Sequence, residues 1–562
     1  MAYLGIDLGT TNSVAIIYND KNDSLDVVRI DGTDEILPSV VSYTEEGITV
    51  GSEAKNGAII YPESTVQSVK RIMGTSEILN INGEKRTPEE VCAEILKKLK
   101  TEAENQAGEV FSEVVITHPA YYNDRQIFAT RQAGLTAGFE NVYLLSEPLS
   151  AAIEYGYRQS YAQTLLVYDL GGGTFDVTVL EKYNNIMEVR AVAGDIFLGG
   201  EDFTEILEKL FLEKIKIDKE TLSQTDIAII KKSVETAKHK FVETQIVTVE
   251  TVVNETQYSS EISLEEYTSH CEDLLSRLRS SIKNAMADAE TPLNQINNII
   301  LVGGATKLPI IKNFVSKLFG RFPLSTINPD EVVGVGAAVH AALKERNEAV
   351  SEMILTDVCP FTLGVESSTK QANGLHYGDL YTPIIERNTI IPVSRVERFS
   401  TMHDGQDSVL CRVLQGENRK ASENSLLGEL VIPIPKADAG VEAADVRFTY
   451  NINGILEVEV TIVSNQFKKT LIIDKNPGIF TQEEIEQKFV DLADFKIHPR
   501  EKEENRLLLS RGERMYQENL GDIRTLINKE LMEFDIALDS QDERKIRDEA
   551  VKLKKFLDSL ER

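Results

Sequence analysis

A glycine-rich turn constrains the fold of this chain more than any other stretch. It reads YDLGGGTFDV over residues 168–177, and apolar runs at 164–167 and 177–180 flank it. This pattern predicts a strand, a tight turn and a second strand. Three glycines let backbone N–H groups approach phosphate oxygens, and the acids on either side can hold a hydrated magnesium ion. Taken alone, the turn is also compatible with an ordinary hairpin, although a ligand-binding turn is favoured.

A second copy of this design stands at the start of the chain. Residues 3–18 again read as strand, turn and strand, with the turn sequence GIDLGTTNS, and Asp7 ends its incoming strand as Asp169 does. Two such hairpins about 160 residues apart predict a duplicated α/β unit with a nucleotide between its halves. Neither a Walker-type nor a dinucleotide-binding glycine motif follows a strand.

Further candidates lie between and after these turns. Lys70 is followed by Arg71, a pair that is also compatible with a solvated face. Glu147 ends a short apolar strand directly before a helix. Glycine pairs at 199–200 and 303–304 precede expected helices, where backbone N–H groups suit anions.

The composition excludes several classes of protein. The net charge of -30 disfavours nucleic acid and anionic membranes as partners, because phosphate binding needs a basic surface. The four cysteines are scattered without metal-ligand or redox spacing, which favours reduced thiols in the cytoplasm. No signal peptide and no run of 18 apolar residues is found, so we expect no membrane span.

The chain changes character after residue 347. Residues 348–357 end a helical run with a polar stretch, three apolar residues and an acid, which fits an interdomain linker or the first strand of the next domain. Short alternating strands between Gly, Pro and Asn turns over 358–478 predict a β-sandwich. Thr481 begins a capping box, and a charged helical segment over 479–562 follows. The expected domains are therefore 1–347, 358–478 and 479–562.

These motifs together resemble the seventy-kilodalton heat-shock (DnaK-type) chaperone family, most closely its short HscC-type branch. The quoted stretches are residues 5–13, 169–176, 199–203, 302–304 and 327–331, in the family's order along nearly the whole chain. The resemblance implies a multidomain protein with an actin-like α/β ATPase domain in two lobes, a β-sandwich peptide-binding domain and a short α-helical lid. It also implies an ATP-dependent chaperone that holds extended apolar segments of unfolded proteins.

The resemblance assigns cofactors and site residues by position. ATP and Mg²⁺ are implied, with K⁺ as a further candidate ion, and Asp7 and Asp169 would hold the water shell of the metal. The implied hydrolytic residues are Lys70, Glu147, Asp169 and Thr174. The implied ATP-binding residues are Thr10, Thr11, Asn12, Gly171, Gly172, Gly173, Asp176, Gly199, Gly200, Glu235, Lys238, His239, Gly303, Gly304, Lys307 and Asp330.

The base end of this site departs from the family pattern. The family commonly has an Arg and a Ser where this chain has His239 and Val242, and often an Arg at Lys307. An imidazole or ammonium stacks on adenine less well than a guanidinium. We therefore expect weaker ATP binding than is usual in the family.

The resemblance extends to the peptide site, the linker and the partners. The implied peptide-binding residues are Val365, Ser367, Ser368, Phe399, Met402, Val409 and Cys411. The implied residues of allosteric coupling are Met353, Ile354, Leu355, Asp357, Pro119 and Arg125. Family members work with a J-domain co-chaperone, here a non-standard one because Tyr143 and Ser146 replace a basic residue and an Asn. The segment 200–303 is short, so the need for a nucleotide-exchange factor is left open.

Two other functions compete with the chaperone. A small-molecule kinase of the same nucleotide fold would need an acceptor site and no β-domain after residue 357. A non-cycling holdase or filament protein that uses ATP structurally would not need Lys70, Glu147, Asp169 and Thr174 together.

Overall fold

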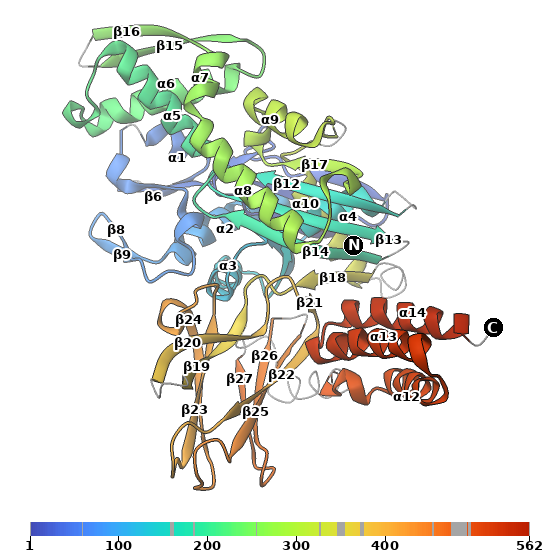
Figure 1. Cartoon of the computed structure of the whole chain (residues 1–562). Helices are drawn as coiled ribbons and strands as arrows, with labels where there is room; N and C mark the ends of the chain where they lie inside the picture. The colour runs from blue at the N-terminus through green and yellow to red at the C-terminus, as the bar shows by residue number, and fades with distance from the viewer. Residues whose placement is uncertain are drawn as a thin grey trace. The chain divides into compact units, whose positions relative to one another are not determined.

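The computed structural model describes residues 2–560 except 46, 59, 158–161, 184–185, 254–255, 325–327, 346–353, 371–375, 452–453, 474–491 and 493–495. The chain forms two compact units, Met1–Pro360 and Phe361–Arg562, which we call the N-terminal and C-terminal units (Figure 1). Most of the predicted linker, with Met353, and the capping box at Thr481 lie outside the described residues.

The N-terminal unit contains two large sheets with the same strand arrangement. In the first, β1 is antiparallel to β2 and parallel to β10, in the order β11, β10, β1, β2, β3, with β4 beside β2. In the second, β12 is antiparallel to β13 and parallel to β17, and β14 and β18 follow β13. These strands are β1 (Ala2–Asp7), β2 (Asn12–Asn19), β3 (Ser24–Val27), β4 (Leu37–Pro38), β10 (Glu113–His118), β11 (Asn141–Ser146), β12 (Gln163–Leu170), β13 (Phe175–Tyr183), β14 (Ile186–Asp195), β17 (Asn298–Val302) and β18 (Ile354–Val358).

Three small sheets complete the unit. β5 (Val40–Thr44) pairs with β6 (Gly47–Val50) and β7 (Thr65–Gln67), β8 (Leu79–Ile81) pairs with β9 (Glu84–Arg86), and β15 (Ile246–Val253) pairs with β16 (Thr256–Ser263). The α-helices are α1 (Ser52–Gly57), α2 (Pro88–Ala107), α3 (Asp124–Thr136), α4 (Glu147–Tyr157), α5 (Gly200–Ile215), α6 (Gln224–Lys240), α7 (Leu264–His270), α8 (Glu272–Asp288), α9 (Pro309–Phe319) and α10 (Val332–Glu345).

Local sequence explains several of these elements. Thr87 caps α2 by accepting from the Glu90 N–H at 3.3 Å, and the Glu90 carboxylate accepts from the Thr87 N–H at 2.8 Å. This is a capping box, which satisfies two backbone donors at a helix start. Helix α10 crosses β1 so closely that a Cβ on Gly5 would collide with the α10 backbone. The small residues of α10 therefore allow the first sheet to be covered tightly.

The C-terminal unit contains two four-stranded antiparallel sheets. Their orders are β20, β19, β23, β24 and β22, β25, β26, β27. Burial alternates along β25, where Val446 and Phe448 face the core, as expected for a sheet with one covered face. The strands are β19 (Leu363–Lys370), β20 (His376–Ile385), β22 (Val393–Ser400), β23 (Ser408–Gln415), β24 (Ser425–Pro433), β25 (Ala443–Tyr450), β26 (Leu456–Ile462) and β27 (Lys468–Ile473).

Among the residues that the structure describes, three α-helices follow the sheets in this unit. They are α12 (Glu503–Glu518), α13 (Gly521–Ser540) and α14 (Glu543–Leu560), and they share an apolar core that includes Ile527, Phe534 and Leu557. In the part of the chain that the structure describes, no helix is long and apolar enough to cross a membrane. All four cysteines are buried and free of disulfides.

Candidate nucleotide site

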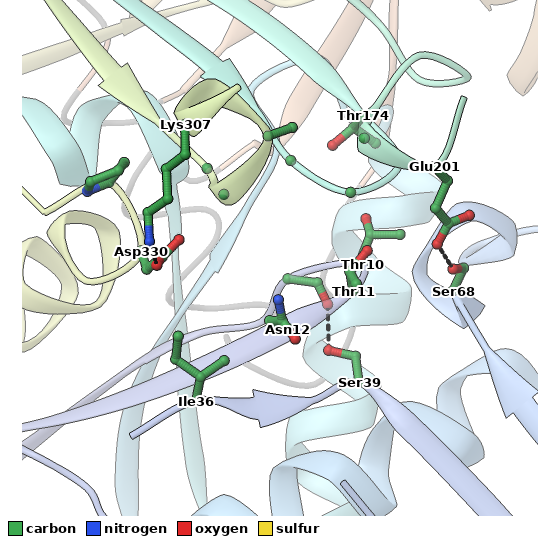
Figure 2. A pocket seen from close by; sticks show the side chains of 18 of the residues that line it. Thr10, Thr11, Asn12, Ile36, Ser39, Ser68, Thr174, Glu201, Lys307 and Asp330 are labelled. Atoms are coloured by element: carbon green, nitrogen blue, oxygen red, sulfur yellow. Dashed lines mark hydrogen bonds and ion pairs between the residues drawn. The ribbon is translucent and has the colours of Figure 1, made fainter. Parts of the chain in front are cut away.

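A single pocket of the N-terminal unit collects most of the residues predicted for ATP. The two glycine turns form opposite walls of it (Figure 2). Its lining includes Asp7, Thr10, Thr11, Asn12, Lys70, Glu147, Asp169, Gly171, Gly172, Thr174, Gly200, Glu235, Lys238, His239, Gly303, Gly304, Lys307 and Asp330. Three residues of the predicted set do not line it: Gly173, Asp176 and Gly199.

The two turns interlock at the centre of the pocket. A Cβ on Gly172 would collide with the Thr11 side chain, so only glycine fits there. The start of α5 supports the turn, because the N–H groups of Gly200 and Glu201 donate to the carbonyls of Gly171 and Gly172 at 2.9 and 2.8 Å. The Thr11 hydroxyl is buried and has no hydrogen-bond partner among the described residues. A buried donor of this kind fits a phosphate oxygen.

Lys70 lies in the pocket wall on a short 3₁₀ helix, η2 (Val69–Ile72), and is 3% exposed. Its Nζ pairs with Glu147 Oε1 at 2.7 Å and also donates to the Leu8 carbonyl. Burial alone would lower the pKa of Lys70, but the carboxylates of Glu147 and Asp7 outweigh it and raise that pKa. The lysine is therefore a fixed positive charge inside the pocket.

Buried carboxylates surround this lysine. Burial and the Glu147 carboxylate raise the pKa of Asp7 to about 7 and that of Asp176 to about 8, and they raise the pKa of Asp169 well above its usual range. Carboxylates placed in this way favour a bound cation. No three acidic, histidine or cysteine side chains among the described residues lie close enough to bind a metal directly. Mg²⁺ keeps several of its waters when carboxylates bind it, so this set fits a hydrated ion.

Asp176, Gly173 and Gly199 lie behind the pocket. Backbone N–H groups of Ala120 and Tyr121 hydrogen-bond to the Asp176 carboxylate. A Cβ on Gly199 would collide with the backbone of Gly173. These residues support the turn from its outer side, where protein already fills their surroundings, so they do not line the pocket, and their assignment to ATP binding stays a prediction.

The far end of the pocket contains the residues expected near adenosine. Glu235 Oε1 pairs with Lys55 Nζ at 3.1 Å, and the nearby His239 imidazole and this ammonium lower the pKa of Glu235 to about 2. Lys238 donates to the Gly200 carbonyl at 2.8 Å and to Thr204 Oγ1 at 2.6 Å, and burial lowers its pKa to about 8. Lys238 therefore ties α6 to α5 as well as lining the pocket.

Several lining residues were missed by sequence reasoning. Figure 2 shows Ile36, Ser39, Ser68 and Glu201 around the two turns and Lys307 paired with Asp330. Ser39 Oγ donates to the Gly9 carbonyl at 2.8 Å and so fixes the first turn. The sequence places Glu201 directly after Gly199-Gly200, but no local pattern predicts its hydrogen bond with Ser68. These contacts join segments far apart in sequence.

The residues predicted for peptide binding all lie in the C-terminal unit. Strand β19 contains Val365, Ser367 and Ser368, strand β22 contains Phe399, and strand β23 contains Val409 and Cys411. Met402 lies in the loop that follows β22. Val365 and Cys411 are buried, and Ser368 is exposed. Their shared role stays a prediction.

The predicted coupling residues lie in the N-terminal unit. Ile354 and Leu355 belong to β18, which pairs in parallel with β14 through Ile186 and Met187. Asp357 ends this segment, and burial raises its pKa to about 6. Pro119 follows β10, where its carbonyl contacts His118 Nδ1 at 2.8 Å, and Arg125 is exposed on α3.

Comparisons with known proteins agree on one family. The family model described as "Hsp70 protein" matches residues 3–79 and 76–561. The chain is 38% identical over 485 residues to the "Chaperone protein DnaK" of Thermotoga neapolitana, covering 84% of this chain and 80% of that protein. The proteins of that name from Thermosipho melanesiensis and Ureaplasma urealyticum are 33% and 34% identical, covering 100% and 99% of this chain and 95% and 93% of theirs.

Proposed function

This chain belongs to the Hsp70 family, and we propose that ATP hydrolysis in the N-terminal pocket controls how tightly the C-terminal unit holds extended apolar peptides. Membership confirms the predictions of a DnaK-type chaperone that depends on ATP and of an ATPase. Hsp70 ATPases use ATP with Mg²⁺. The kinase and the non-cycling holdase are not favoured by these matches.

The observation that carries the proposal is the buried ion pair of Lys70 and Glu147, which lines the pocket between the two glycine turns. Phosphoryl transfer to water needs placement and charge neutralisation more than covalent chemistry. Lys70 would stabilise the charge that develops on the transferred phosphoryl group and orient the attacking water. Glu147 and Thr174 would help to position that water, and the Thr10–Asn12 turn would bind the phosphates.

Bound Mg²⁺ would supply neutralisation of the phosphate charge. Asp7 and Asp169 would hold its water shell from the two halves of the unit, where Asp7 is also fixed by a 3.0 Å hydrogen bond from Thr117 Oγ1. Because both halves contribute ligands, the nucleotide would hold them together. This arrangement supports assigning the unit an actin-like fold with two lobes over residues 1–347. We also propose K⁺ as a further ion of the site.

The proposed output runs through β18. The turn at 171–174 leads into β13, β13 pairs with β14, and β14 pairs with Ile354 and Leu355. A shift of the turn would therefore reach β18 across only two strands. This supports the proposal that residues 348–357, with Pro119 and Arg125, couple nucleotide state to peptide affinity.

The C-terminal unit supplies the proposed peptide clamp. Two packed antiparallel sheets support a β-sandwich over 358–478, and the helices α12 to α14 support a lid over 479–562. The acidic net charge of -30 supports peptides rather than nucleic acid as ligands. We further propose a cytoplasmic protein of the short HscC-type branch that works with a J-domain co-chaperone.

Steady-state ATP hydrolysis with and without an extended apolar peptide tests the proposal. We expect slow hydrolysis that the peptide accelerates and that a magnesium chelator abolishes. Hydrolysis that no apolar peptide accelerates would refute the coupling, and the absence of any ATP hydrolysis with Mg²⁺ present would refute the function itself.

A further inference from the structure

The short helix that carries Lys70 is fastened to the opposite half of the N-terminal unit. Ser68 Oγ, at its start, donates to the Glu201 carboxylate (Figure 2). Arg71, directly after Lys70, reaches Asp202 Oδ2 at 3.2 Å and Glu201 Oε2 at 3.5 Å. Glu201 and Asp202 are in the first turn of α5, which starts beside the second phosphate turn.

Arg71 packs on the outer side of that turn. A Cβ on Gly173 would collide with Arg71 Nε, which is buried and has no hydrogen-bond partner among the described residues. Arg71 does not line the nucleotide pocket, although Ser68, Lys70 and Glu201 do. The guanidinium therefore holds the wall of the site without reaching into it.

The acceptors of Arg71 are themselves held in place, Asp202 by the residue that caps α5 and Glu201 by the second turn. Asp202 Oδ2 also accepts from the Gly199 N–H at 2.7 Å, and the Glu201 N–H donates to the Gly172 carbonyl at 2.8 Å. A planar guanidinium can engage two carboxylates at fixed angles, which a lysine ammonium cannot do equally well. The contact therefore depends on the two halves having a defined spacing.

The backbone at Ser68 adds a second feature to this contact. Ser68 has φ of 54°, a left-handed conformation that is uncommon for non-glycine residues. No side chain caps the start of η2, and the Ser68 hydroxyl bonds across to Glu201 instead. Loss of the opposite half would remove the contact that holds this turn in place.

We propose that Arg71, Glu201 and Asp202 form a closure contact that positions Lys70 for hydrolysis when the two halves come together. Lys70 and Arg71 are adjacent on one short helix, so they move together. Closure would thus enclose the nucleotide and bring the ammonium, which Glu147 and the Leu8 carbonyl hold within its own half, up to the second phosphate turn, and opening would withdraw it from that turn. Arg71 is a positioning residue, and the inference rests on the proposed hydrolytic function of Lys70.

The test compares Arg71→Gln with the unsubstituted chain. Single-turnover hydrolysis at saturating ATP is expected to fall about tenfold, because small misplacements of a positioned group cost at least that much in rate. The dissociation constant for ATP is expected to change by less than about threefold, since Arg71 touches no nucleotide-facing surface of the pocket. A role in fold stability alone would not separate these two quantities.

Two further variants sharpen the result. Glu201→Gln is expected to slow hydrolysis as well, and the double variant R71Q/E201Q is expected to be no slower than R71Q, since E201Q removes a carboxylate that R71Q has already left without its guanidinium, while the amide oxygen can still accept from Ser68. Arg71→Lys should recover part of the rate. Lys214→Gln is the matched control, because Lys214 lies on the same helix α5 but pairs with Glu266 at 2.7 Å within the second half. It should leave hydrolysis unchanged.

The outcomes separate this inference from the proposed function. If the unsubstituted chain hydrolyses ATP and R71Q does so at the same rate at saturation, the closure contact is wrong and the function stands. If R71Q loses ATP affinity alone, or if the effects of R71Q and E201Q multiply in full, the positioning role is also wrong. If the unsubstituted chain hydrolyses no ATP, both fail. Should R71Q not fold, E201Q decides the matter alone.

Discussion

Replacing Lys70 by Met tests the chemistry of the pocket most directly. Met preserves the length of the aliphatic side chain but removes the ammonium 2.7 Å from Glu147. Both partners are buried, Lys70 at 3% and Glu147 at 7% exposure, so the Glu147 carboxylate loses its counter-charge where little water can replace it. Breaking a buried ion pair from one side costs about 3–5 kcal/mol of folding free energy.

The expected loss of rate is larger than any loss of binding. A fixed charge that stabilises the transition state in a closed site contributes about 2.7–4 kcal/mol, so hydrolysis should fall by about 10²- to 10³-fold. ATP binding should persist, because the two turns and their N–H groups are unchanged. Hydrolysis is measured by single-turnover release of phosphate, and binding is measured by calorimetry with Mg²⁺.

The double variant K70M/E147Q separates stability from chemistry. Removing both charges should restore much of the lost stability, because the carboxylate is no longer stranded. It should not restore hydrolysis. A K70M variant that hydrolyses ATP at the rate of the unsubstituted chain would contradict the role assigned to Lys70, and a double variant as unstable as K70M would contradict the stranded-charge argument.

Three further predictions concern the linker, a buried lysine and a tyrosine. Replacing Ile354 and Leu355 by Asp should abolish peptide stimulation of hydrolysis by disrupting β18; stimulation that survives would contradict the linker role. The pKa of Lys238 is about 8 in the folded chain and higher when unfolded, so the unfolded state binds more protons between these values and folding stability should rise with pH from about 8 to about 10.5, by at most about 3 kcal/mol. Denaturant unfolding of Lys238→Met should lack this rise, and an identical pH profile would refute it. Tyr122→Phe removes a 2.9 Å hydrogen bond to the Lys70 carbonyl and should cost about 1 kcal/mol and slow hydrolysis, which equal unfolding midpoints and rates would disprove.

The parts of the site that were predictable from sequence are local. Each glycine turn sits between two apolar strands, and glycine spacing alone shows that the backbone passes close to something. Gly172 confirms the logic, since the side chain of Thr11 fills the space that a Cβ would need. At Asp176 the sequence cannot tell the two sides of the turn apart, because an acid beside a glycine turn has the same pattern whether it faces the pocket or the protein behind it.

The contacts that close the site could not be predicted in this way. Ser68 meets Glu201 across 133 positions of the chain, and Lys55 meets Glu235 across 180. Charged residues of this kind are common on solvated surfaces, and nothing in their neighbours distinguishes a surface pair from one that bridges two halves. The sequence predicts only that Arg71 belongs to a basic pair, because the role of this residue depends on the position of α5.

The charge balance of the pocket predicts that nucleotide and metal bind together. Asp7, Asp169 and Glu147 place three carboxyl groups around one fixed positive charge, Lys70, and burial already raises the pKa of both aspartates. Without a metal, the phosphates of ATP would add negative charge beside carboxylates whose ionised form burial already destabilises. Mg²⁺ reverses the sign of this interaction, since the same carboxylates then orient its waters and the phosphates share its charge. On the proposed function, these acids would therefore favour a metal-bound nucleotide over a free one.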